Sequence, residues 1–190
     1  MEEKKCTAAS LTEKTLTSTL LYDGRVVHLY RDTVRLPNGH ETIREVIRHV
    51  GAVCVLPLFD DGNVLVERQF RYPHARVLLE IPAGKLDAPD EDPLEAAQRE
   101  LREETGATAA EWHALGMFCP VGAYSTERIQ MYLARGLTFG ERELDEDEFL
   151  NVFRMPLDEL VDKVLAGEIP DAKTQAAALR AKLMLERGLI

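Results

Sequence analysis

The sequence predicts an α/β protein, in which helices cover a mixed sheet and an antiparallel strand region precedes that sheet. Three observations predict this class. Short apolar runs bounded by turn residues indicate strands, segments with helical spacing of apolar residues follow them, and the two kinds alternate along the chain. At 190 residues, the chain has room for one main domain and a small additional region. We expect the strand region at 1–49 and the main domain at 50–190.

Two hairpins are predicted in the first half of the chain. RVVHLYRDTVRL and HETIREVIRH flank a turn in which Asn38 and Gly39 would supply the positive φ angles of a tight hairpin. GAVCVLPLF and VLVERQF flank the turn DDGN, and the first of these strands is almost wholly apolar, as expected when both faces are covered. The short strand VLLEI then leads into a Pro-Ala-Gly turn.

A helix is predicted shortly after this turn. Asp92 suits the N-cap, Pro93 suits the first helical position, and Glu95 completes a capping-box-like arrangement. Gly106 is a stop signal at the C-terminal end. The residues of the expected buried stripe recur at helical spacing: Leu94, Ala97 and Leu101.

The rest of the chain alternates in the same way. EWHALGMFC and RIQMYLARGLTF read as strands on either side of the loop PVGAYSTE, and FLNVFRM reads as a strand after an acidic turn. Two closing helices are expected, one from Pro156 to Gly167 and one from about Asp171 to Gly188. Strands interleaved with helices predict a mixed sheet with helices packed on it.

The composition argues against several classes of partner. A formal net charge of -10 argues against a nucleic-acid backbone, whereas a phosphorylated small molecule is compatible if cations bridge the repulsion. Three widely spaced cysteines indicate reduced thiols in a cytoplasmic protein rather than a disulfide framework. The N-terminus lacks the apolar stretch of a secretory signal, and no apolar run approaches the roughly 20 residues that cross a bilayer, so no membrane partner is expected.

Acidic residues gather at the C-terminal end of the predicted helix. Glu100 and Glu104 share one helix face, with Glu103 beside them. A solvated acidic face would carry interspersed lysines, but neither Glu100 nor Glu104 has a basic residue three or four positions away. The helix macrodipole also disfavours anions at this end. A divalent cation would offset both effects: Mg²⁺ prefers carboxylate and carbonyl oxygens, Mn²⁺ is compatible with them, and the lack of a His/Cys cluster argues against zinc.

The segment from Gly84 to Ala107 resembles the Nudix box. It reads G-x6-E-x7-R-E-L-R-E-E-T-G-A, where the usual form is G-x5-E-x7-R-E-U-x-E-E-x-G-U with U a bulky aliphatic residue. This sequence has one extra residue between Gly84 and Glu91, and it ends in Ala107 rather than a bulky residue. If Asp90 were the first acidic position, the misfit would move into the x7 segment, so we prefer Glu91. The extra residue precedes the helix and leaves its register unchanged.

The resemblance implies a Nudix-type α/β/α sandwich that hydrolyses a nucleoside diphosphate linked to another moiety. It makes Glu100 and Glu104 the principal metal ligands, with Glu103 assisting or positioning water and the carbonyl of Ala83 completing the site. It also assigns structural support of the site to three residues: Gly84, Glu91 and Arg99.

Other stretches resemble the ADP-ribose pyrophosphatase branch of this family, over about residues 20 to 185. They include IREVIRHVGAVCVLPL, VLVERQFRYP, LLEIPAGKLD, GAYSTERIQMYLA and IPDAKTQAAAL. The resemblance implies a homodimer that exchanges its N-terminal strands and cleaves ADP-ribose, a nucleoside diphosphate sugar, into AMP and ribose 5-phosphate with Mg²⁺. GDP-mannose or another nucleotide sugar remains the alternative substrate. A non-catalytic nucleotide sensor is a more distant alternative, because such a protein is expected to lose glutamates that this box retains.

Further site residues follow from the same resemblance. The acidic turn ELDEDEF carries an E-x-E, Glu146 and Glu148, of which one is expected as the catalytic base or a metal contact, with Glu148 preferred. A solvated acidic turn is the alternative. Glu80 is expected near the metals or in a structural ion pair. The residues expected to bind substrate are Arg71, which resembles a diphosphate contact, together with Arg44, Glu45 and Glu127; each has an ordinary surface role as its alternative.

Overall fold

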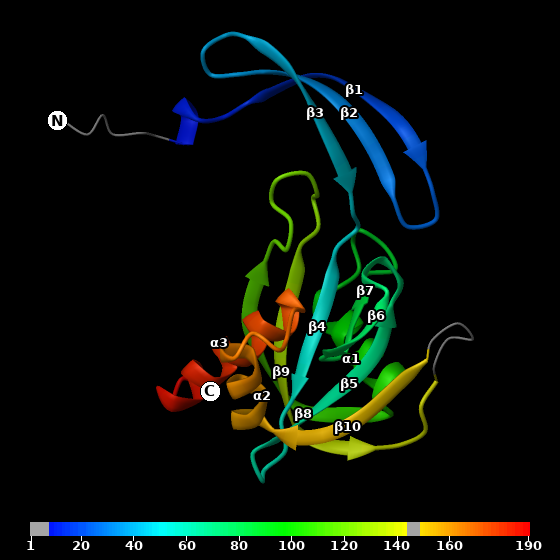
Figure 1. Ribbon diagram of the computed structural model, residues 1–190, viewed down its shortest axis with the longest axis vertical. Coiled ribbons are helices and arrows are strands. Elements are labelled where there is room, and N and C mark those ends of the chain that lie inside the picture. The colour runs from blue at the N-terminus through cyan, green and yellow to red at the C-terminus, as the bar shows by residue number, and fades with distance from the viewer. Residues whose placement is uncertain (1–7, 144–148) are drawn as a thin grey trace, which may run out of the picture. The chain divides into compact units, whose positions relative to one another are not determined.

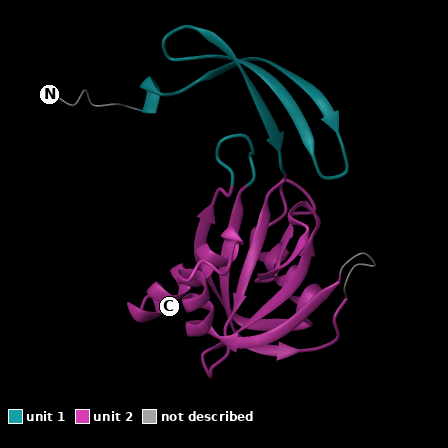
Figure 2. Ribbon diagram, in the orientation of Figure 1, with its two compact units in different colours: residues 1–49, 121–127 teal, residues 50–120, 128–190 magenta. Residues whose placement is uncertain are grey.

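The computed structural model describes residues 8–143 and 149–190. The chain divides into two compact units, whose described parts are residues 8–49 with 121–127 and residues 50–120 with 128–143 and 149–190 (Figure 2). The boundary near residue 50 falls where the first hairpin region ends and the buried strands begin. Each unit has its own sheet structure.

The first unit is a three-stranded antiparallel sheet. Its strands follow the order of the chain: β1 (Lys14–Asp23), β2 (His28–Arg35) and β3 (Glu41–Arg48), after a short 3-10 turn, η1 (Ala8–Ser10). Leu36 and His40 close the predicted β2–β3 turn by a backbone hydrogen bond of 2.8 Å. Only Gly39 adopts a positive φ, of 88°, so the expectation of two such residues was wrong for Asn38. Asn38 instead accepts a hydrogen bond from the His40 backbone, at 3.1 Å.

The described residues of the second unit form two sheets and three α-helices (Figure 1). The mixed sheet has the order β7-β4-β9-β8, in which β4 and β9 run parallel and the other neighbours antiparallel. The second sheet is antiparallel with the order β10-β5-β6. The bounds are β4 (Ala52–Pro57), β5 (Asn63–Arg71), β6 (Arg76–Glu80), β7 (Ala83–Lys85), β8 (Ala107–Phe118), β9 (Ile129–Phe139), β10 (Leu150–Pro156), α1 (Pro93–Thr105), α2 (Leu157–Leu165), α3 (Ala172–Glu186) and the short turn η2 (Tyr72–His74).

The central strand β4 explains the layering. Its residues from Val53 to Leu56 are all 0% exposed. Val53 and Val55 belong to a core cluster with α1 residues such as Leu101, whereas alternate residues, including Leu56, belong to a second cluster with α2 and α3 residues such as Leu160. Because successive strand side chains point to opposite faces, helices cover both sides of the mixed sheet. The predicted α/β/α architecture is confirmed.

Local signals define the ends of α1 as predicted. Asp92 caps the helix by accepting hydrogen bonds from the backbone of Leu94, at 2.7 Å, and of Glu95, at 3.3 Å. Gly106 ends it in the left-handed conformation with φ of 72°. The buried face differs slightly from the prediction, because Leu94 is only partly buried and Ala96 is fully buried.

Two strands were not predicted, and both lack the pattern that reveals strands. β1 is exposed along almost its whole length, so it shows no alternation of buried and exposed residues. β7 spans only three residues of the Pro-Ala-Gly segment and is defined by its backbone pairing with β4, not by its side chains. In the described part of the chain, no helix is both long and apolar enough to cross a membrane.

Candidate active site

Glu104 joins helix α1 to the edge of the mixed sheet. Its side chain is on the last turn of α1 and the residue is only 3% exposed. Its Oε2 atom accepts a hydrogen bond of 2.9 Å from the backbone of Ala83 in β7, and Ala83 is paired with Cys54 of the central strand β4. The sheet core therefore fixes both the Glu104 carboxylate and the backbone beside it.

Gly84 lies directly against the carboxylate of Glu100. A Cβ atom at Gly84 would be 1.9 Å from Oε1 and 2.0 Å from Cδ of Glu100, so any side chain there would displace the carboxylate. Gly84 is needed for this close approach. The extra residue before Glu91 does not separate the helix from the strand, because both the Gly84–Glu100 and the Ala83–Glu104 approaches are present.

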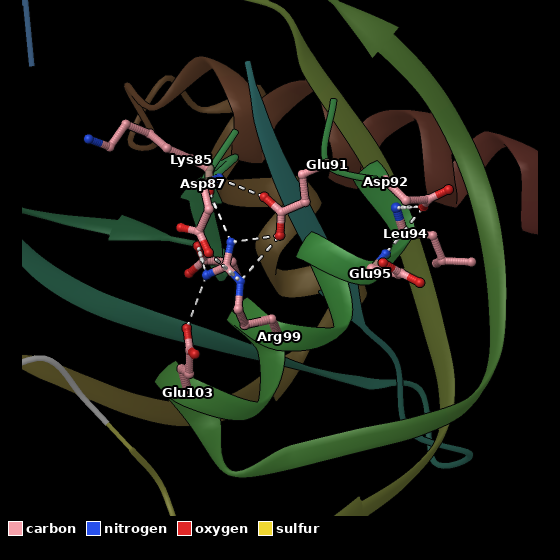
Figure 3. Close-up of polar contacts among 9 residues, drawn as sticks. Lys85, Asp87, Glu91, Asp92, Leu94, Glu95, Arg99 and Glu103 are labelled. Atoms are coloured by element: carbon pink, nitrogen blue, oxygen red, sulfur yellow. Dashed lines mark hydrogen bonds and ion pairs between the residues drawn. The ribbon is translucent and has the colours of Figure 1, made fainter. Parts of the chain in front are cut away.

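Arg99 is the centre of a group that we call the acidic cluster (Figure 3). The cluster consists of Asp87, Glu91, Arg99, Glu100 and Glu103. Arg99 Nη1 donates to Glu100 at 2.8 Å and to Glu103 at 3.2 Å, and its Nη2 donates to Glu91 at 3.3 Å. Nε lies 3.5 Å from Oδ2 of Asp87. One guanidinium is thus shared among four carboxylates.

The loop before α1 is tied to the same arginine. Glu91 accepts a hydrogen bond of 2.6 Å from the Asp87 backbone, and the Lys85 carbonyl accepts one of 3.2 Å from Arg99 Nη2 (Figure 3). Burial by itself would lower the pKa of Arg99, but the charges of Glu100, Asp87 and Glu91 and the hydrogen bond to Glu100 outweigh burial and raise it. Arg99 therefore stays protonated and holds the loop to the helix.

The donors at this site suit a hard divalent cation. Carboxylates from Glu100, Glu103 and Glu104 and the backbone carbonyl of Ala83 would offer oxygen atoms only, which favours Mg²⁺ or Mn²⁺ over zinc. Negative charge exceeds positive charge in the acidic cluster, and Gly84 keeps side-chain bulk away from Glu100. Within residues 8–143 and 149–190, no three His, Cys, Asp or Glu side chains form a preassembled metal-holding group. Glu100 and Glu103 face Arg99, so holding a cation requires them to turn.

A second charged group, the Glu80 cluster, lies where β6 ends. It consists of Arg71, Glu80, Asp171 and Lys173. Arg71 donates to Glu80 through Nε at 2.8 Å and Nη2 at 2.6 Å, and Lys173 donates to the same carboxylate. Glu80 is 1% exposed, and its burial would by itself raise its pKa; hydrogen bonds and charges from Arg71 and Lys173 lower the pKa overall. The carboxylate is therefore held ionised in a buried position.

The remaining predicted substrate residues belong to the other unit. Arg44 and Glu45 are in β3; Arg44 donates to Glu13 at 2.7 and 3.0 Å, and Glu45 is paired across the sheet with Arg31. Glu127 follows a segment that pairs with the end of β3, and its backbone donates to the Ser125 hydroxyl at 3.1 Å. Glu146 and Glu148 lie outside the described residues.

Sequence reasoning missed Lys173 and Asp171. Lys173 is buried, bonds both Glu80 and Asp171, and lies in the first turn of α3. A lysine in that turn opposes the helix macrodipole, and this conflict was the available signal. Its partner Glu80 is 93 residues away in the sequence, so no local pattern connects the two.

Two known protein families together match nearly the whole described chain. Residues 48–178 match the NUDIX domain family, and residues 13–47 match the nucleoside diphosphate sugar hydrolase N-terminal domain family. The first match alone covers more than half of the 190 residues. The chain belongs to the Nudix family. The predicted resemblance is confirmed at the level of the family.

Individual Nudix relatives cover most of the chain. An ADP-ribose pyrophosphatase of Bacillus subtilis is 42% identical over 170 residues, which are 88% of this chain and 91% of that protein. A methanol dehydrogenase activator of Bacillus methanolicus is 40% identical over 167 residues, covering 87% and 90%. A solved structure described as an ADP compounds hydrolase superposes with a TM-score of 0.82, at 23% identity, over 94% of this chain and 97% of that one. The structural match supports the Nudix fold.

Proposed function

We propose that this Nudix hydrolase cleaves the pyrophosphate bond of ADP-ribose with Mg²⁺, releasing AMP and ribose 5-phosphate. The observation that carries the proposal is the arrangement around α1: Glu100 lies against Gly84, and Glu104 bonds Ala83 on the sheet edge. The similarity to an ADP-ribose pyrophosphatase over most of both chains supports the choice of substrate.

The residues at the end of α1 are proposed to hold the metal. Glu100 and Glu104 would be the principal ligands, Glu103 an assisting ligand or a water-positioning group, and the Ala83 carbonyl a further donor. A bound divalent cation would stabilise charge on the diphosphate oxygens and lower the pKa of a coordinated water. Mn²⁺ would serve the same donors.

Arg99, Glu91 and Gly84 are proposed as structural support for that site. Arg99 holds the carboxylates through charge-assisted hydrogen bonds, and Glu91 fixes the other edge of its guanidinium. Gly84 leaves the space that the Glu100 carboxylate fills. Loss of any of the three would disturb the geometry of the ligands without removing one.

Substrate recognition is assigned to two groups of residues. Arg71 is proposed to contact the diphosphate, because its side chain is 36% exposed and a guanidinium is suited to bidentate phosphate contact. Arg44, Glu45 and Glu127 are proposed to contact the nucleotide or the ribose. Replacing Arg44 or Glu127 by alanine should raise KM for ADP-ribose more than it lowers kcat, as measured by steady-state kinetics.

One residue of the acidic turn is proposed as the catalytic base or a metal contact. Glu146 and Glu148, which match the E-x-E pattern, are the candidates, with Glu148 preferred. Glu148→Gln should lower kcat by roughly a hundredfold, the usual contribution of a positioned general base, and leave KM nearly unchanged. If only Glu146→Gln does so, the assignment passes to Glu146; if neither does, the turn is a solvated surface.

The N-terminal strand region is proposed to join two copies of the chain by exchange of its strands. Among the described residues of β1 to β3, only Asp32 and Val34 are buried, and apolar side chains such as Tyr22 and Ile43 are more than half exposed. A three-stranded sheet with so little burial is marginal by itself, because stable sheets need a covered apolar face. Light scattering after gel filtration should give a homodimer, and a monomeric mass would contradict this proposal.

A cytoplasmic protein without nucleic-acid or membrane partners fits the charge and the cysteines. Cys54 and Cys119 are free thiols in the described chain, and burial raises the pKa of Cys54 to about 12. The net charge of -10 disfavours binding to a phosphate backbone.

A substrate panel tests the proposed function. The kcat/KM values for ADP-ribose, GDP-mannose and other nucleotide sugars would be compared with Mg²⁺ and with EDTA. We expect ADP-ribose to give the highest value and EDTA to abolish turnover. Preference for GDP-mannose would establish the alternative substrate, equal weak rates on all would leave only the pyrophosphatase class, and tight binding without turnover would indicate a sensor.

A further inference from the structure

In the Glu80 cluster, two cationic side chains donate to one buried carboxylate, whereas an ordinary ion pair has one. Glu80 is 1% exposed and already has a bidentate partner in Arg71, with bonds of 2.8 and 2.6 Å. Lys173 adds a second cation on Oε2, and its own side chain is only 10% exposed. Asp171 balances it at 3.1 Å from Nζ. The Lys173 bond therefore has to be explained separately from the Arg71 pair.

Local physics opposes a lysine at this position. Lys173 is in the first turn of α3, where the macrodipole favours anions, and burying an ammonium group carries a large desolvation cost. Buried ion pairs often add little to stability compared with apolar residues of similar size. Arg71 already pairs the Glu80 carboxylate through two hydrogen bonds, so stability alone does not require a second buried cation there.

Arg71 gives the cluster an exposed end. Its side chain is 36% exposed, whereas Glu80 is 1% exposed. The bonds to Glu80 use Nε and Nη2, and Nη1 has no hydrogen-bond partner within the described residues. A guanidinium fixed along one edge presents its other donors in a defined direction, which is the geometry that diphosphate oxygens accept.

The same turn of α3 also holds the strand segment beside the acidic cluster. The Thr174 hydroxyl accepts a hydrogen bond of 3.0 Å from the Ile81 backbone and donates one of 2.6 Å to Asp171. Two residues after Ile81, the Ala83 backbone donates to Glu104. The start of α3 thus bonds to residues 80 and 81, and the segment that follows carries the proposed metal site.

We propose that Lys173 is a positioning residue for the pyrophosphatase reaction: it fixes the Glu80 carboxylate, which in turn orients Arg71 toward the substrate diphosphate. This inference rests on the proposed function. Lys173 does not touch the substrate; it acts only through Glu80 and Arg71. Its effect therefore appears in substrate binding and depends on the presence of Arg71.

A double-mutant cycle tests this dependence. Lys173→Met removes the charge and keeps most of the side-chain volume, and Arg71→Met removes the proposed diphosphate contact. With ADP-ribose and saturating Mg²⁺, we expect Lys173→Met to raise KM by roughly tenfold and to change kcat much less. Loss of one charge-assisted hydrogen bond changes an affinity by about this factor. In the Arg71→Met background the same change should leave KM unaltered, because the group that Lys173 positions is absent.

Two variants separate positioning from general damage. Lys173→Arg keeps a cation against Glu80 and should restore KM to within about threefold of the unsubstituted protein, on the scale of one weak contact. Lys182→Met is the matched control, because Lys182 is also on α3 and bonds Asp158 at 2.6 Å and Glu186 at 3.3 Å, away from Glu80. It should leave both KM and kcat unchanged. If Lys173→Met does not fold, the cycle is run with Lys173→Gln, which removes the charge and keeps a polar group at Glu80.

The outcomes distinguish this inference from the proposed function. Effects on KM that multiply in the double variant, or a fall in kcat alone, would overturn the positioning role while leaving the pyrophosphatase intact. Absence of any turnover by the unsubstituted protein would overturn both.

Discussion

The acidic cluster and the Glu80 cluster are built from the same ion-pair chemistry with different ratios of charge: one cation to four carboxylates in the first, and two cations to two carboxylates in the second. In the acidic cluster, one guanidinium is shared among four carboxylates. In the Glu80 cluster, one buried carboxylate receives both a guanidinium and an ammonium. The acidic cluster therefore keeps an excess of negative charge that a cation would neutralise. In the Glu80 cluster, Arg71 keeps N–H donors from which an anion can accept hydrogen bonds. A metal-bound diphosphate needs both.

The two clusters also differ in how firmly they are held. The Glu80 carboxylate is 1% exposed, whereas the Glu103 side chain is 31% exposed and the Asp87 side chain 76% exposed. Buried, doubly bonded charges resist rearrangement, while part-exposed carboxylates around one arginine can turn to a new cation at small cost. The comparison predicts that loss of the Glu80 carboxylate itself chiefly changes stability, and that substitutions near the acidic cluster chiefly change activity and metal response.

The largest effect is expected from Glu104→Gln. This change keeps the side-chain shape and removes the charge proposed to bind the metal, so kcat/KM for ADP-ribose should fall by roughly a thousandfold, equivalent to about 4 kcal/mol of transition-state stabilisation. The circular dichroism spectrum should be unchanged. Glu95→Gln, on the exposed first turn of the same helix, is the control and should retain full turnover. Near-native turnover by Glu104→Gln would remove the metal role from this face of α1.

Glu80→Gln should have the next largest effect, on stability. It leaves Arg71 and Lys173 close together without their shared anion, and breaking a buried pair in this way costs about 3 kcal/mol of unfolding free energy near pH 7. The pKa of Glu80 is lowered in the folded protein. The stability that its ionised carboxylate contributes is therefore present above the pKa of the unfolded state, about 4.3, and is lost as the pH falls through the lower pKa of the folded state.

Denaturant unfolding at a series of pH values measures this linkage. The difference between the unsubstituted protein and Glu80→Gln should be constant from about pH 7 to pH 5 and should shrink below about pH 4. Glu168→Gln removes an exposed partner of Lys163 and should cost under about 1 kcal/mol at any pH. A difference at Glu80 that stays constant down to pH 3 would mean that the carboxylate is not the titrating group.

The sequence predicted the features that local chemistry determines. The ends of α1 follow from Asp92 and Gly106, which act on their own neighbours, and the buried strand β4 follows from its unbroken apolar run. The spacing of the glutamates likewise placed Glu100 and Glu104 on one face. These signals are complete within a dozen residues, so no knowledge of the fold is needed to interpret them.

Long-range partners could not be predicted in the same way. Lys173 meets Glu80 across 93 residues, and only the packing of α3 against the sheet brings them together. β7 exists because its backbone pairs with β4, a property that three residues of Ala, Gly and Lys do not encode. The conflict between Lys173 and the helix dipole is a local signal that a partner exists, but it does not identify that partner.

Gly84→Ala should reduce activity by a smaller factor. The new Cβ would lie 1.9 Å from Oε1 of Glu100, so the carboxylate has to move away from the proposed metal site while remaining in the protein. We expect kcat/KM to fall by roughly tenfold or more, comparable with the loss of a group that orients a metal ligand. Gly140→Ala is the matched control, because its Cβ would approach no atom closer than 3.9 Å. Equal activities of the two variants would show that the Glu100 position is not critical.

The smallest effect is expected from Arg99→Met, and it concerns the metal response. Without Arg99, the carboxylates of the acidic cluster repel one another, so in EDTA the variant should lose about 1 kcal/mol of stability, or roughly 2–4 °C in Tm. A bound cation would replace the missing positive charge and order the carboxylates that Arg99 otherwise holds, and a ligand that binds only the folded state stabilises that state.

Saturating Mg²⁺ should therefore raise the Tm of Arg99→Met more than that of the unsubstituted protein and close most of the gap between them. Arg102→Met is the control, because Arg102 is an exposed arginine in the last turn of the same helix and has no bond to these carboxylates within the described chain. The measurement is thermal unfolding of all three proteins with EDTA and with Mg²⁺. The same Mg²⁺ shift of Tm in all three proteins would show that Arg99 and the metal do not share the carboxylates. The acidic cluster would then be as fixed as the Glu80 cluster, and the contrast between the two clusters would be wrong.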